Sequence, residues 1–171
     1  MPPGNVRGTS DDRRMKSQPT IRSILAEFFD EETTHKRGVI RQRNLAVQTM
    51  LGRYLELEGD RTLTDAGFAI LQAERAFEPN NAFTRTMHAE DLLVALSGFI
   101  EPPWLAIDLL LRHRQLALVN ALLGFLCREM LIDERGAACF LLETRAQIDR
   151  AKRVLADERR SVSESNRMDL R

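Results

Sequence analysis

The feature that most constrains the fold is the stretch from Trp104 to Ile132, in which most residues are apolar. It contains no proline, and its only glycine is Gly124. So much apolar surface has to be buried against other apolar surface, which indicates a protein built around core helices. Polar and charged residues interrupt the stretch at Arg112–Gln115. We therefore predict two core helices that meet at this interruption. The expected inward side chains of the second are Leu116, Val119, Leu122, Leu123, Leu126 and Met130.

The same stretch is long enough to cross a bilayer, but Arg112, His113 and Arg114 fall in its middle, where a bilayer penalises charge most. The first twenty residues are polar and lack the apolar core of a signal peptide. Cys127 and Cys139 stand among apolar neighbours, so we predict two buried free thiols rather than a disulfide. These features favour a cytoplasmic protein without a membrane span.

Helical periodicity is clear near the N-terminus. After Thr20, a potential N-cap, apolar residues recur with the spacing of one helix face: Ile21, Ile24, Leu25, Phe28 and Phe29. Gly38 interrupts the pattern, and a second helix is predicted from Val39 to Glu58, ended by Gly59. Its expected inward side chains are Ile40, Val47, Met50, Leu51, Tyr54 and Leu55.

The rest of the chain continues the helical pattern. Thr64 can cap a third helix, a fourth holds Leu92–Phe99, and Pro102 and Pro103 impose a sharp boundary after it. No stretch alternates convincingly with the period of a strand. We therefore predict an all-α fold, a compact bundle of about six or seven helices with disordered polar termini. The expected organisation is a disordered tail over residues 1–19, one helical domain over 20–160 and a flexible tail over 161–171.

The last helix is predicted from about Ala137 to Arg159. Its small or apolar positions follow a heptad-like spacing of 4, 3, 4, 3 and 4 residues, and they are Ala137, Leu141, Thr144, Ile148, Ala151 and Leu155. One interpretation is a helix that packs on its own domain. The other is a helix shared between subunits, with Leu141, Ile148 and Leu155 at the interface of a homo-oligomer.

Two histidines stand beside carboxylates. Glu32 precedes His35 with the Glu-x-x-His spacing of carboxylate-bridged di-iron helix bundles, which need that motif from two helices. The other pair, His88 with Asp91, has the reverse order, and its acid suits the start of a helix. Motifs for nucleotides, for structural zinc and for nucleophilic serine are absent. The sequence thus predicts no catalytic residue, no metal ligand and no cofactor.

The distribution of charge is more informative than its sum. The chain has 25 basic and 25 acidic residues, but no acid occurs from Thr33 to Leu55. Four cations lie there near a predicted helix start, Lys36, Arg37, Arg41 and Arg43, and this arrangement suits phosphate contacts on duplex DNA. The alternative is that they offset the acidic end of the preceding helix. Few exposed aromatic residues are evident, which favours duplex over single-stranded DNA.

Two segments resemble known families. Residues 20–59, TIRSILAEFFDEETTHKRGVIRQRNLAVQTMLGRYLELEG, resemble the core-binding domain of tyrosine recombinases, which implies a helical module that clasps duplex DNA. That resemblance does not extend to a catalytic domain, because Tyr54 is the only tyrosine and its position in the pattern is inward. Arg61–Leu71, RTLTDAGFAIL, is similar to the Leu-Thr-x-x-Gly segment that follows the wing of winged-helix regulators.

Three functions follow from these observations, in order of preference. The first is a non-enzymatic helical interaction or regulatory protein that self-associates. The second is a small DNA-binding regulator or accessory protein that uses the basic helix. The third is a metal-dependent or other enzyme that uses His35 or His88 with nearby carboxylates.

Overall fold

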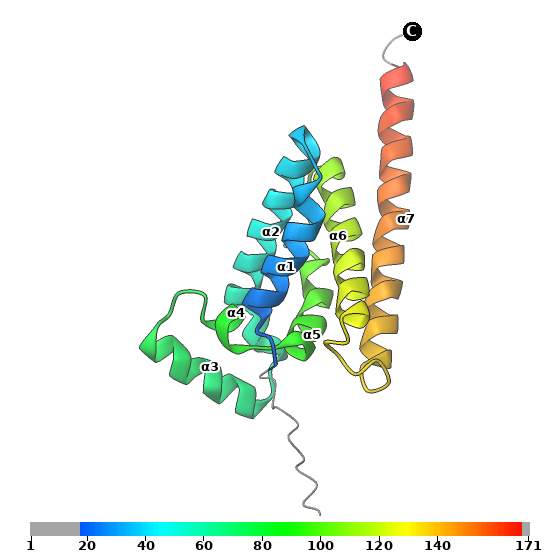
Figure 1. Ribbon diagram of the computed structural model, residues 1–171. Helices are drawn as coiled ribbons and strands as arrows, with labels where there is room; N and C mark the ends of the chain where they lie inside the picture. Colours follow the sequence, from blue (N-terminus) through cyan, green and yellow to red (C-terminus); the bar gives the residue numbers. More distant parts are fainter. Residues whose placement is uncertain (1–17, 169–171) are drawn as a thin grey trace, which may run out of the picture.

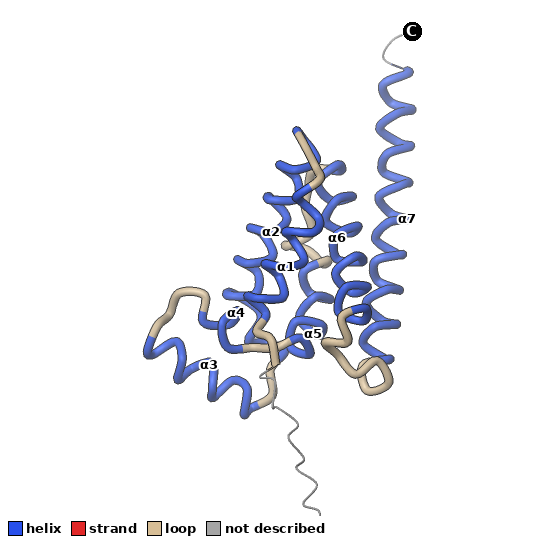
Figure 2. The backbone as a smooth tube through the Cα atoms, in the orientation of Figure 1, coloured by secondary structure: helices blue, strands red, loops and turns tan. Residues whose placement is uncertain are grey.

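The computed structural model describes residues 18–168, and every regular element in this range is a helix (Figures 1 and 2). The elements in chain order are α1 (Ile21–Thr34), α2 (Gly38–Glu58), the 3₁₀-helix η1 (Gly59–Thr62), α3 (Asp65–Phe77), α4 (Ala82–Thr86), α5 (Ala89–Phe99), α6 (Leu109–Arg128) and α7 (Ala138–Met168). The predicted all-α bundle is therefore confirmed. None of the described helices carries an apolar window long enough to cross a membrane.

Helices α1 and α2 form an antiparallel hairpin at one edge of the bundle (Figure 1). The Thr20 hydroxyl accepts a hydrogen bond from the Ser23 backbone amide and so caps α1. All five apolar side chains predicted for the inner face of α1 are buried. The chain then reverses at Gly38, whose φ of 56° lies in the left-handed region that glycine adopts without strain.

Helix α6 lies in the middle of the bundle, between α2 on one side and α7 on the other (Figure 1). Its buried apolar side chains include Leu116, Leu122 and Leu126, and neighbouring helices cover it on two sides. Phe125 packs edge-on against Phe28 of α1, with ring centroids 5.6 Å apart. Tyr54 of α2 packs edge-on against Trp104, with ring centroids 5.4 Å apart.

The prediction of two core helices meeting near Arg112–Gln115 is wrong, because a single helix, α6, runs through these residues. The polar side chains do not break the helix; they hold the preceding turn against it. The fully buried Gln115 amide donates to the Phe99 and Trp104 carbonyls and accepts from the Ala106 amide. Arg112 donates to the Ala106 carbonyl. Buried backbone groups of residues 99–106 are thereby satisfied.

Helix α7 is longer than predicted, since it continues from Arg159 to Met168 through much of the segment expected to be a flexible tail. Its far end rises past the other helices (Figure 1). At the other terminus, the Pro19 carbonyl lies 3.1 Å from Nδ1 of His88. The prediction of a disordered tail over residues 1–19 falls mostly on residues 1–17, outside the described residues.

Three side-chain predictions are wrong. Ile40 and Met130 were expected to point inward, but Ile40 is about half exposed at the start of α2, and Met130 is largely exposed after α6 ends. Met130 has a φ of 51°, so the backbone turns away there and the helical face does not extend to it. Cys139 is an exposed thiol at the start of α7, whereas Cys127 is half-buried.

Candidate nucleic-acid interface

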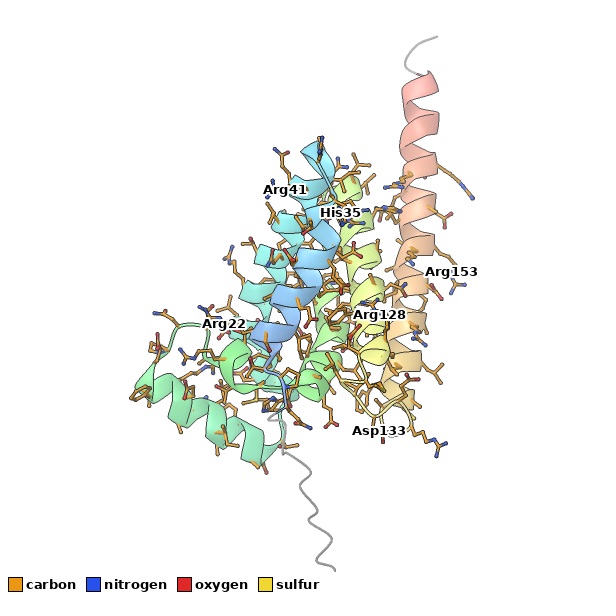
Figure 3. The ribbon with its side chains drawn as sticks, in the orientation of Figure 1. Arg22, His35, Arg41, Arg128, Asp133 and Arg153 are labelled. Carbon is orange, nitrogen blue, oxygen red and sulfur yellow. The ribbon has the colours of Figure 1, made fainter. Side chains whose placement is uncertain are left out.

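The tip of the α1–α2 hairpin gathers three cations. Lys36 and Arg37 lie in the turn between the helices, and Arg41 lies in the first turns of α2. All three side chains are exposed. Figure 3 labels Arg41 and His35 at this end of the molecule, far from Asp133 at the opposite end. Three of the four cations that the sequence predicted for phosphate contacts thus lie together on one exposed surface, and their contact with DNA stays a prediction.

A groove of about 630 Å³ runs between α1 and α2 beneath these cations. Lys36, Arg37 and Arg41 line it, and Asp30 is the one acidic residue among its described lining side chains. The Asp30 carboxylate accepts a hydrogen bond from the Thr34 hydroxyl at 3.2 Å. The Thr33 side chain also lines the groove, and its buried hydroxyl makes no hydrogen bond with the described residues.

Two of the three acids at the end of α1, Glu31 and Glu32, pair with arginines of α6 instead of with the cations. Glu32 accepts from Arg114 at 3.0 Å, and Glu31 accepts from Arg128 at 2.9 Å. A hydrogen bond to Glu129, together with the nearby Glu31 carboxylate, raises the pKa of the Arg128 guanidinium. The acidic end of α1 is therefore offset by arginines distant in sequence.

The cations of the hairpin tip keep their charge free of partners within residues 18–161. No carboxylate of these residues forms an ion pair with Lys36, Arg37 or Arg41. The first turn of α2 adds to the positive potential of this surface. Its N-cap residue, Arg37, makes no side-chain cap hydrogen bond, and the turn contains no acid that would offset the positive end of the helix dipole. We call Lys36, Arg37 and Arg41, together with this helix start, the basic tip.

Two neighbouring residues do not belong to the basic tip. Arg43 is half-buried and does not line the groove, because it lies two residues after Arg41 and so points to another side of α2. Asn44, three residues after Arg41, is fully buried. Its amide donates to the Glu32 carbonyl at 2.7 Å, and its oxygen accepts from Arg114. It therefore joins α1, α2 and α6 instead of facing solvent.

The two histidines predicted as alternative sites lie on different elements, His35 at the end of α1 and His88 at the start of α5. His35 is exposed at the C-cap of α1, while both glutamates before it are engaged by arginines. His88 is the N-cap of α5, where the Asp91 carboxylate accepts from the His88 backbone amide at 3.0 Å. Among the described residues, no group of three or more His, Cys, Asp or Glu side chains is placed to hold a metal ion.

A second cavity, of about 270 Å³, lies between η1 and the turn after α5. Its lining includes Tyr54, Glu58, Arg61 and Trp104. The Tyr54 hydroxyl donates to the Ala95 carbonyl at 2.7 Å, and burial raises the pKa of Tyr54 to about 12. A phenol held protonated in this way supports the packing of α2 on α5 and is not prepared to act as a base.

The residues predicted for an oligomer interface, Leu141, Ile148 and Leu155, lie on the inner face of α7 and belong to the core. They are at least nine-tenths buried within the single chain. This is the packing described by the first interpretation of the heptad-like spacing, a helix on its own domain. Any second copy would have to contact other residues.

Sequence reasoning missed the pairing of Glu31 and Glu32 with α6, because ion pairs across many residues leave no local signal. It also missed an exposed apolar face on α3, for which a signal existed in the spacing of Ala66, Ile70, Ala73 and Phe77. Comparison with known proteins adds no further assignment: no family model, no curated protein and no solved structure matches this chain.

Proposed function

We propose that this protein is a regulatory or accessory protein that binds duplex DNA through the basic tip and acts by binding rather than by catalysis. The observation that carries the proposal is that Lys36, Arg37 and Arg41 share one exposed surface without carboxylate partners among residues 18–161. Cations without partners can neutralise DNA phosphates and release the counterions condensed on them. The resemblance of residues 20–59 to recombinase core-binding domains covers the same hairpin and supports the proposal.

The balance of charge makes the proposal specific to this surface. The whole chain has 25 basic and 25 acidic residues, so no general attraction to a polyanion is expected. Phe29 is the aromatic residue in the groove lining, and it is buried, so bases cannot stack on it. We therefore expect contacts with the phosphates of a duplex, with little dependence on base sequence.

The test is fluorescence anisotropy of a labelled duplex titrated with the full chain at several salt concentrations. Three phosphate contacts predict a slope of about −2.7 in log K against log salt, or about a 40-fold loss of affinity between roughly 50 and 200 mM. The triple variant K36E/R37E/R41E should abolish the salt-dependent binding. Absence of binding at low salt, or binding that is insensitive to salt, would contradict the proposal.

A matched control separates the basic tip from total charge. The triple variant R22E/R53E/R153E reverses three other exposed arginines, and so changes the net charge by the same amount. Figure 3 labels Arg22 and Arg153 well away from Arg41. This variant should retain most of the affinity of the wild type. An equal loss in both triple variants would show that net charge, and not the basic tip, governs binding.

A further inference from the structure

The outer face of α3 is apolar and exposed along its whole length. Ile70 is 56% exposed and Phe77 is 87% exposed. Residues 66, 70, 73 and 77 are spaced as i, i+4, i+7 and i+11, so they form one stripe on the helix. The members of the stripe and its flank are all exposed: Ala66, Ala69, Ile70, Ala73, Ala76 and Phe77. Figure 1 shows α3 standing away from the other helices at one end of the molecule.

Polar contacts on the other side of α3 fix this orientation. Arg75 donates to the Asp60 carboxylate at 2.8 Å and to the Glu56 carbonyl at 3.0 Å. Arg85 of α4 pairs with Glu74 and, at 3.1 Å, with Glu78. Leu71 is the one fully buried apolar side chain of α3. The helix is thus held by its charged side, and its apolar stripe is left for another surface to cover.

The stripe is complementary in size to a second copy of itself. In an antiparallel pair related by a two-fold axis, the numbers of two facing residues add up to the same total for every facing pair. With the axis between Leu71 and Gln72, Phe77 faces Ala66 of the other copy, and Ile70 faces Ala73. Each large side chain then meets a small one, which allows the two helices to approach to about 8–10 Å.

We propose that α3 of one copy packs antiparallel against α3 of a second copy and makes this protein a weak homodimer. The stripe carries no charge, so it offers nothing for an oppositely charged partner to recognise, whereas two uncharged stripes suit each other. A 13-residue helix is about 20 Å long, so we expect a pair of them to bury less than the roughly 1,200 Å² at the lower end of stable interfaces. We therefore expect a weak dimer with a dissociation constant in the micromolar range. The dimer does not rest on DNA binding.

Sedimentation of the full chain from about 1 to 500 µM tests the dimer, because a micromolar dissociation constant places the transition in this range. The wild type should shift from monomer to dimer. Phe77→Asp should remove the dimer, since it places a charge against Ala66 of the other copy, while its thermal unfolding stays unchanged. Leu142→Asp, at another exposed apolar position, on α7, should dimerise as the wild type does. A wild type that remains monomeric overturns the proposal.

A size exchange tests the antiparallel register. Ala66→Phe adds apolar area and would strengthen any unspecific apolar docking, but in the proposed pair it meets Phe77 of the other copy and should weaken the dimer at least tenfold. The double variant A66F/F77A exchanges the two members of the pair and should restore the dimer. Failure of the double variant to dimerise, or a stronger dimer for Ala66→Phe alone, would overturn the antiparallel pairing.

Discussion

Helices α3 and α7 both lie at the edge of the bundle, and both carry a stripe of small and apolar residues, but only the stripe of α7 is covered by its own chain. The spacing is the same in both, alternating between four and three residues. On α7 the stripe contains Ile148, which is fully buried, and on α3 it contains Ile70, which is 56% exposed. Spacing therefore identifies the residues that share a face, but not the surface that covers them.

The neighbours of each helix explain the difference. Helix α7 lies along α6 and contacts α5, and both of these offer apolar side chains in its direction. Helix α3 lies beside η1 and α4, which offer Asp60 and Arg85. A helix packs with the side whose groups find matching partners on its neighbours. Helix α7 therefore packs with its apolar side, and α3 packs with the side that carries Glu74 and Arg75.

The largest expected effect is the difference in stability loss between truncating Ile148 on α7 and truncating Ile70 on α3. Ile148→Ala removes a fully buried side chain from the seam between α7 and the bundle, and we expect a loss of about 2–5 kcal/mol in the free energy of unfolding. Ile70→Ala removes a side chain already exposed to water, and we expect a change within about 0.5 kcal/mol. Urea denaturation at low micromolar protein measures both in the monomer. Equal losses would mean that α3 is packed as tightly as α7.

A smaller effect concerns the ion pairs that hold the two helices. Asp60→Asn removes the carboxylate that Arg75 of α3 contacts, and Glu158→Gln removes the carboxylate that Arg112 contacts on α7. Because α3 has few buried apolar contacts, we expect Asp60→Asn to lower the local stability of α3 by about 1 kcal/mol. The amides of α3 would then exchange about fivefold faster. The amides of α7 should be unchanged in Glu158→Gln. Faster exchange in α7 would contradict this division of roles.

Most of the fold could be predicted from local patterns, because caps and apolar spacing act over a few residues. Thr20 and Thr64 cap the helices they were expected to cap, and the inner face of α1 is as predicted. The continuity of α6 could not be predicted. Gln115 looks like a surface residue until the carbonyls of Phe99 and Trp104 are known to lie beside it.

The candidate site could likewise be predicted only as far as local patterns reach. The grouping of Lys36, Arg37 and Arg41 follows from the position of a turn, which the sequence shows. The orientation of the Glu31 and Glu32 side chains depends on arginines of α6 that lie more than eighty residues away in the chain. Whether the cations are neutralised is therefore a property of tertiary packing, and local spacing cannot decide it.

The smallest expected effect is a pH dependence confined to the α7 side of the molecule. Burial, followed by Arg159, Lys152 and Arg114, lowers the pKa of His113 from its ordinary value of 6.5. The unfolded chain therefore takes up a proton at higher pH than the folded chain, and the contribution of His113 to stability is lost as the pH falls below about 6.5. Lys152 and Arg159 lie on α7, so protonation of His113 sets like charges against that helix. We expect the amides of α7 around these residues to lose protection between pH 7.5 and 5.5, after correction for intrinsic exchange rates, while those of α3 do not. In His113→Gln the α7 amides should lose less protection over the same range, and identical profiles for the variant and the wild type would show that other groups set the pH dependence.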